Sequence, residues 1–322
     1  MATYGPDLGT EIPRPRGLTT PDIVRGTLRG KRFRPGDLVV QGMLFATLLV
    51  ALAVLVILLA DVTRRAVPVL QDRGTDFLTS PTSTFASRAG IVQGIVGSLE
   101  MMLLVILVSF PIGIGAAVYL EEYARETRFT RFLQTNIRNL AGVPSIVYGL
   151  LGLAIFAQAL GGLTGGYSLV SGGLTLAILV LPIVIITSSE ALRAVPQSIR
   201  EAGYGVGATR WEVIRSHVLP SAAPGIFTGT VLTLARALGE TAPLLLVGAV
   251  TGYFSTGSAG FFQQIRTDHG YTSLPTTIFS WSTQPNADFR GLTAAAIVVL
   301  LVVLLTVNAV AIVLRNRYER KW

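Results

Sequence analysis

The chain contains no cysteine, and this absence removes several kinds of chemistry at once. Disulfide bonds, thiol nucleophiles and cysteine-ligated metal sites are all excluded. Charge is also scarce, because Asp, Glu, Lys and Arg make up only 14% of the 322 residues, whereas 51% are hydrophobic and the mean hydropathy is +0.59. In soluble domains, about a quarter of the residues are charged. The composition therefore predicts a protein that lies mostly within a membrane.

The common sequence signatures of enzymes are missing as well. Residues 26–32, GTLRGKR, have the wrong spacing for a phosphate-binding P-loop, so we expect the chain to bind no ATP itself. The two histidines, His217 and His269, are expected on opposite sides of the membrane, where they cannot share a metal site or a catalytic triad. No G-x-S-x-G motif of serine hydrolases occurs. We therefore expect a non-enzymatic protein with no metal and no cofactor of its own.

Six apolar stretches are long enough to cross a membrane, which takes about 20 mostly apolar residues in a helix. They cover residues 38–60, 95–120, 139–160, 168–188, 224–254 and 291–314. A polar arm of residues 1–37 precedes them, so the first stretch is expected to be a retained anchor and not a cleaved signal peptide. Residues 61–90 are interpreted as an external loop and residues 315–322 as a tail. The pattern predicts an all-helical, multi-pass membrane protein with its main domain at residues 91–314.

The distribution of Lys and Arg predicts the orientation of these spans. Cytoplasmic loops carry the excess of basic residues. The arm, the loop 121–139, the loop 189–220 and the tail hold 7, 4, 4 and 4 of them, whereas the loops 61–90 and 255–290 hold 4 and 2. Nineteen basic residues against six predict that both termini are cytoplasmic. The net charge of +8 follows from topology, and because no continuous basic patch forms, we expect no nucleic-acid partner.

A polar, glycine-punctuated hairpin follows the fourth span. Pro196 stands where the first turn of a helix tolerates proline, and Gly207 stands where a helix can end in a left-handed residue. Thr209 opens a second helix with Glu212 three residues later, which is the capping-box spacing, and we expect Pro220 to end that helix. A hairpin of this kind on the cytoplasmic side predicts a docking element. The alternative is an amphipathic connector with no partner.

Arg236 and Glu240 form a charged pair within the fifth span, in the sequence LTLARALGETAPLLLVG. The spacing of four residues places both on one face of a helix. A charge at mid-membrane costs about 2.5 to 3.5 kcal/mol, so it usually faces a partner or a watery path. An arginine suits an oxyanion because its planar guanidinium donates two parallel hydrogen bonds and stays charged. We expect a site on the route of an anion, with a buried salt bridge as the alternative.

Two further features are weaker indications. The sequence GVPSIVYG places Gly142, Pro144 and Ser145 at the start of the third span, where glycines allow close helix contact and a proline allows a bend. Gating and simple packing explain this segment equally well. Glu100 lies near the outer end of the second span, and we interpret it as a carboxylate at the membrane interface.

The hairpin at residues 196–220 contains Glu-Ala-Gly, three further residues, Gly-Ala and then Val-Leu-Pro. This pattern resembles the EAA loop of ATP-binding-cassette importer permeases. The resemblance implies that its short helix seats in a groove of an ATPase subunit, through Glu201, Ala202, Gly203, Tyr204, Gly207 and Ala208. One departure is that Gly203 replaces the usual alanine, and Gly205 follows, at about 1 kcal/mol each in a helix interior.

The similarity extends over most of residues 90–315. The segments LPIVIITSSEALRAVPQSIREAGYGVGATRWEVI, LARALGETAPLLL, GVPSIVYG and LPTTIFSWSTQPNADF look like the PstA-type permeases of the bacterial phosphate-specific importer. The resemblance implies a type I, MetI-like permease core of five spans with one added N-terminal span, in the plasma membrane of a bacterium. It also implies a phosphate pathway through Arg236, Glu240 and Thr241.

The same resemblance implies a set of partners. They are a PstC-like permease that completes a heterodimer, a PstB-like ATPase dimer that binds ATP and Mg, and a PstS-like phosphate-binding protein outside. A permease for another oxyanion or a small organic solute is the alternative, since the EAA-like loop is shared and substrate choice depends on few residues. The sequence contains no cluster of nucleophile and base that would indicate an intramembrane enzyme. A scaffold without transport activity is a further alternative, and co-purification with an ATPase would distinguish a transporter from it.

Overall fold

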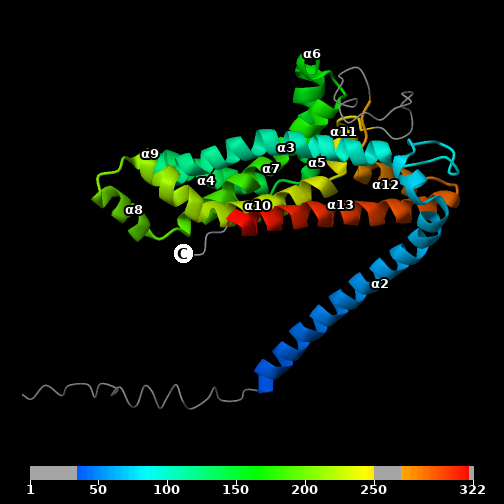
Figure 1. Ribbon diagram of the computed structural model, residues 1–322, viewed down its shortest axis with the longest axis horizontal. Helices are drawn as coiled ribbons and strands as arrows, with labels where there is room; N and C mark the ends of the chain where they lie inside the picture. Colours follow the sequence, from blue (N-terminus) through cyan, green and yellow to red (C-terminus); the bar gives the residue numbers. More distant parts are fainter. Residues whose placement is uncertain (1–34, 250–269, 319–322) are drawn as a thin grey trace, which may run out of the picture. The chain divides into compact units, whose positions relative to one another are not determined.

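The computed structural model describes residues 35–249 and 270–318, and every regular element within these ranges is a helix (Figure 1). Five helices are long and apolar enough to cross a membrane, and a sixth crossing results if the bent pair Arg128–Ala141 and Ser145–Ala159 counts as one span. The expected all-helical membrane fold is confirmed. Most of the N-terminal arm, the end of the expected fifth span, His269 and the end of the tail lie outside the described residues.

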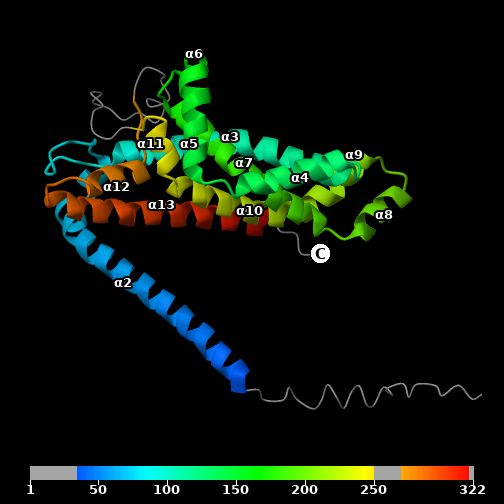
Figure 2. The same cartoon turned by 180° about the vertical axis from the view of Figure 1, so that it is seen from behind.

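Three long helices build the centre of the bundle: α3 (Val92–Val118), α7 (Leu169–Arg193) and α10 (Leu219–Gly239), which run side by side in both views (Figures 1 and 2). Small residues bring them close together. A Cβ atom on Gly113 of α3 would lie 2.7 Å from Cγ1 of Val184 on α7. Small residues between membrane helices permit such dense packing, which contributes where lipid removes the usual hydrophobic driving force.

A separate hydrophobic cluster packs the C-terminal helices of the chain together. It joins α12 (Leu274–Ser282) and α13 (Asp288–Tyr318) to the later part of α2 (Pro35–Thr79). Phe77 of α2 stacks at an angle on Trp281, with 6.3 Å between the ring centroids. The part of α2 before residue 59 forms a unit of its own, in which every described side chain is exposed.

The length of α2 corrects one expectation. We expected residues 61–90 to form a loop, but the helix continues through its charged residues to Thr79, with one non-helical residue at Gly74 (φ 47°, ψ −123°). The buried side chains of Ala66 and Phe77 explain the difference. They give this stretch an apolar stripe that packs on the bundle, and tertiary packing stabilises a helix more than composition does.

A second correction concerns Pro220, which does not end a helix. Helix α9 (Arg210–Val213), the π-helical turn η3 (Ile214–Val218) and α10 continue as one helix from Arg210 to Gly239. The turn before the proline is already wide, because the N–H of Leu219 donates to the carbonyl of Ile214, five residues back. A widened turn tolerates a residue that has no N–H to donate.

The expected third span, residues 139–160, contains the bend that its proline allows, and a helix precedes it in the segment that we expected to be the loop 121–139. Helix α4 (Arg128–Ala141) ends before Pro144, and the chain then turns by 100° into α5 (Ser145–Gly152) and the π-helical segment η2 (Leu153–Ala159). Both views show α5 and the short α6 (Gly161–Thr164) rising away from the long helices. Proline disfavours helical geometry in the residue before it, which explains the position of the break.

Candidate coupling hairpin and anion pathway

The hairpin has the local geometry that its sequence predicts. Helix α8 (Gln197–Gly205) is followed by Gly207 with a φ of 84°, a left-handed conformation that favours glycine. Thr209 then starts α9 with a complete capping box, in which its backbone N–H donates to Glu212 Oε2 at 2.7 Å and its hydroxyl accepts from the Glu212 N–H. These reciprocal bonds satisfy N–H groups that a helix start leaves free.

Gly203 has a packing role that the sequence did not reveal. It is buried, and a Cβ atom at this position would lie 2.7 Å from Cγ2 of Val213, so α8 and α9 meet at this glycine. The other expected docking residues, Glu201, Ala202, Tyr204 and Gly207, are exposed, and Ala208 is half-buried. Tyr204, Val206 and Trp211 add an apolar outer surface, with Val206 85% exposed. A hairpin with a rigid inside and an apolar outside suits docking onto a partner.

Two ion pairs connect the base of the hairpin to η1 (Tyr119–Tyr123), the π-helical turn that follows α3. Arg200 of α8 binds Glu122 at 2.6 Å and also donates to the carbonyls of Val195 and Leu192, at 2.8 and 3.0 Å. Both side chains are largely buried, with 13% and 4% exposed. Arg193 binds Glu121 at 2.7 Å at a more open position. Sequence reasoning missed both pairs, and its only available signal was the Glu-Glu doublet at the end of the second span.

The fifth span is broken where the charged pair lies. Helix α10 ends at Gly239, Glu240 is extended (φ −76°, ψ 127°), and α11 (Ala242–Leu246) starts after Thr241. Arg236 and Glu240 therefore do not share one continuous helix. They still form an ion pair, but its 3.5 Å separation is longer than the 2.6 Å of Arg200–Glu122, and the Arg236 side chain is 50% exposed. Within the described part of the chain, Glu240 is the only ion-pair partner of Arg236, so its guanidinium keeps donors for another anion.

The structure brings the two broken spans together. Gly149 of α5 lies against α11, because a Cβ atom on it would come within 2.7 Å of the Pro243 Cα. The segment with Gly142, Pro144 and Ser145 and the segment with Thr241 thus belong to helices in direct contact. The close contact and the bend agree with the expectation for GVPSIVYG. A gating role for this segment stays a prediction.

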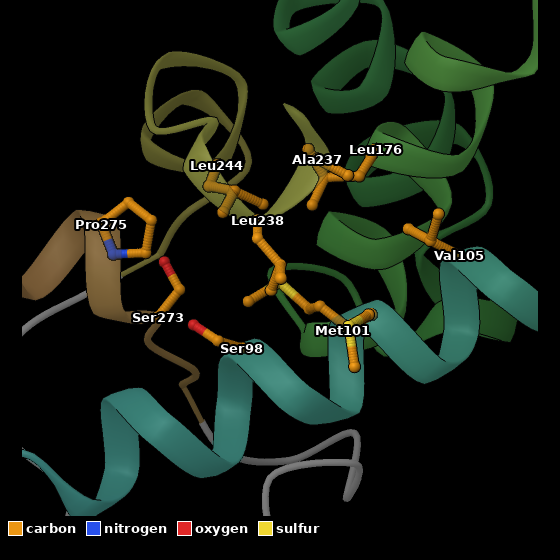
Figure 3. A pocket seen from close by; sticks show the side chains of 10 residues that line it. Ser98, Met101, Val105, Leu176, Ala237, Leu238, Leu244, Ser273 and Pro275 are labelled. Atoms are coloured by element: carbon orange, nitrogen blue, oxygen red, sulfur yellow. The ribbon is translucent and has the colours of Figure 1, made fainter. Parts of the chain in front are cut away.

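A narrow, mostly apolar pocket lies beside the break in α10 (Figure 3). Ala237 and Leu238, next to Arg236 in the chain, line it together with Met101 of α3 and Leu244 of α11. Glu100, one residue before Met101, is only 1% exposed, and neither of its carboxylate oxygens has a hydrogen-bond partner in the described part of the chain. Neighbouring helices therefore cover this face of α3, and the place of Glu100 near the membrane interface stays a prediction.

The described residues contain no cluster of three or more His, Asp or Glu side chains that could hold a metal ion. The recognisable features are instead a bundle of spanning helices, two adjacent broken spans with a partly free arginine, and an exposed helical hairpin. Together they define a helical membrane permease.

Comparison with known proteins identifies the family. Residues 109–321 match the model of the binding-protein-dependent transport system inner membrane component, and the chain belongs to this family of ATP-binding-cassette importer permeases. The chain is 34% identical over 244 residues to the phosphate transport system permease protein PstA of Xylella fastidiosa, covering 75% of this chain and 81% of that one. It is 35% identical over 176 residues to the probable ABC transporter permease protein YqgI of Bacillus subtilis, covering 54% and 58%.

A solved structure shares the fold. A chain in the crystal structure of a bacterial alginate ABC transporter with its oligosaccharide-bound periplasmic protein aligns with a TM-score of 0.65 at 16% identity, covering 89% of this chain and 97% of that one. The expected type I permease architecture is confirmed. The chain is therefore a multi-pass permease subunit of the inner membrane.

Proposed function

We propose that this chain is the PstA-type permease subunit of an ATP-driven importer of inorganic phosphate. The carrying observation is the partly free Arg236 at the break of α10, where it pairs only loosely with Glu240. A guanidinium in a broken span provides a positively charged binding site for an oxyanion inside the membrane. PstA proteins that are 34% and 35% identical over 75% and 70% of this chain support phosphate as the oxyanion.

The partners follow from the same proposal. A PstC-like permease completes the pathway, a PstS-like protein delivers phosphate from outside, and two PstB-like ATPase subunits bind ATP and Mg. The ATPase contact is assigned to the hairpin around Glu201, Tyr204 and Gly207, whose outer surface is exposed and apolar. With this hairpin inside the cell, both termini are cytoplasmic, as the distribution of basic residues predicts.

The continuous helix from Arg210 to Gly239 supplies a mechanical link for coupling. It spans 30 residues, or about 45 Å at 1.5 Å per residue, from the hairpin to the break beside Arg236. Helix α8 packs closely against the first turn of this helix at Gly203, and Arg200 joins α8 to η1 through Glu122. Rigid helices would therefore transmit the movement of a docked ATPase to the anion site beside Arg236. This movement would open that site alternately to the two sides of the membrane.

The direct test is uptake by the purified complex in reconstituted vesicles. With the binding protein outside and ATP inside, we expect accumulation of phosphate well above that of sulfate or phosphonate. Uptake of sulfate or of a small organic solute in preference to phosphate would reject the assigned substrate while leaving the permease family intact. A complex with no ATP-dependent uptake of any of them would reject the transport role.

A further inference from the structure

Helices α4 and α7 enclose a groove at the hairpin end of the bundle, which is separate from the pocket beside the break in α10. Both views show α4 lying along this end (Figures 1 and 2). The groove consists of two hollows with about 330 and 950 Å³ of open space. The two hollows share four lining residues, so they adjoin each other: Leu120, Glu121, Gln134 and Arg193.

The groove changes its character along its length. Its inner part is lined by four aliphatic side chains, Leu120, Ile137, Ile185 and Ile186, and also by polar ones that include Arg138 and Glu190. Its mouth is polar and contains Arg125 and Arg131 together with the hydroxyls of two threonines. Aliphatic side chains are thus gathered in the inner part, whereas the mouth is polar, and this arrangement matches a molecule that has an apolar chain and a polar head.

The charges of the groove are not balanced internally. Arg193 is held by Glu121, but Arg125, Arg131 and Arg138 form no ion pair with any described residue. Two carboxylates without an ion pair in the described residues, Glu126 and Glu190, also line the groove. Three arginines without an ion pair therefore face two such carboxylates, which leaves the groove with a net positive charge. At the mouth, Arg125 and Arg131 face only Glu126.

The outer face of α4 is suited to contact with lipid. The helix has no buried residue, and Phe129 and Phe132 are 67% and 61% exposed beside the arginines. A strongly amphipathic helix with Phe and Arg side chains is typical of the boundary between headgroups and acyl chains. The groove therefore opens at the level where phospholipid headgroups lie.

We propose that the groove between α4 and α7 binds an anionic phospholipid of the leaflet on the hairpin side. The headgroup phosphate lies between Arg125 and Arg131, and an acyl chain covers Ile137, Ile185 and Ile186. Basic pockets between membrane helices bind anionic headgroups in this way. A free inorganic phosphate is the weaker occupant, because it would leave the four aliphatic side chains of the inner part uncovered.

A bound lipid would join α4 to α7 directly beside the Arg193–Glu121 pair, which also lines the hollow at the base of the hairpin. The lipid is thus placed to stabilise the end of the bundle that carries the hairpin. This proposal depends on the membrane location of the chain and not on the transported substrate, so its failure would leave the proposed function untouched.

The test uses the assembled, detergent-purified transporter and native mass spectrometry after addition of phosphatidylglycerol or phosphatidylcholine. We expect selective retention of phosphatidylglycerol. In Arg125→Gln/Arg131→Gln the affinity for it should fall about 25-fold, at about fivefold per arginine. The control Arg128→Gln/Arg317→Gln removes the same charge from exposed positions that do not line the groove, and it should stay within about twofold of the parent.

Unchanged retention of phosphatidylglycerol in the groove variant, or equal retention of phosphatidylcholine by the parent, would overturn the proposal. A competition arm separates the two sources of phosphate. Millimolar inorganic phosphate should not displace the lipid, and displacement would identify an ion site instead. Size-exclusion profiles of both variants verify that the complex is assembled, so that a loss of lipid is not a loss of structure.

Discussion

Gly203 and Val213 lie so close together that a single added methyl group at Gly203 would come within 2.7 Å of Cγ2 of Val213. This contact sets how α8 crosses the start of the long helix that ends beside Arg236. The glycine that departs from the usual alanine of the EAA loop is thus matched to a bulky valine across the hairpin.

This match predicts a rescue experiment. Gly203→Ala should force the two helices apart and reduce ATPase stimulation by the binding protein several-fold, although alanine is the better helix former. Adding Val213→Ala removes the clashing methyl groups and should restore coupling. Gly205→Ala is the control, since nothing lies within 4 Å of that position. Full coupling in Gly203→Ala alone would show that the hairpin angle is not fixed by this contact.

The second prediction concerns the buried pair of Arg200 and Glu122. Arg200→Gln strands a carboxylate that is only 4% exposed and should destabilise the subunit by about 3 to 5 kcal/mol, seen as a lower yield of assembled complex. Arg200→Gln/Glu122→Gln should recover much of the yield. The matched control is Arg193→Gln, whose pair with Glu121 is more exposed and is expected to contribute about 1 kcal/mol or less. Equal losses at Arg193 and Arg200 would contradict this assignment.

The third prediction separates transport from architecture at Arg236. If its guanidinium contacts phosphate, Arg236→Gln should abolish or severely reduce uptake while the complex still assembles. The double change Arg236→Gln/Glu240→Gln should then stay inactive. Phosphate uptake and complex yield are measured for Arg236→Gln, for Glu240→Gln and for the double variant. Recovery of uptake in the double variant would leave Arg236 as the partner of Glu240 and nothing more.

The fourth prediction is the membrane topology, which is testable because the chain lacks cysteine. Ser87→Cys, between α2 and α3, should react with an impermeant maleimide added outside the cell. Ser198→Cys, at the start of α8, should react only after the membrane is opened. Both side chains are exposed, so access depends on the side of the membrane. The opposite labelling pattern would invert the orientation and remove the hairpin from the ATPase side.

The sequence by itself determined the features that depend on neighbours within a few residues. The apolar stretches, the left-handed Gly207 and the capping box of Thr209 and Glu212 all depend on local sterics and local hydrogen bonds, and the structure contains them. The same locality explains two errors. A proline rule predicted an end at Pro220, but a widened turn before the proline lets the helix continue. Charge predicted a loop after residue 60, but packing against α12 and α13 extends the helix there.

Only the tertiary structure decided which distant residues meet. Glu122 and Arg200 are 78 positions apart, and Gly149 touches Pro243 although each belongs to a different broken span. No local pattern encodes these contacts, because they depend on how whole helices pack and where a span breaks. Burial of Glu100 is decided in the same way, since a helix face becomes interior only when other helices cover it.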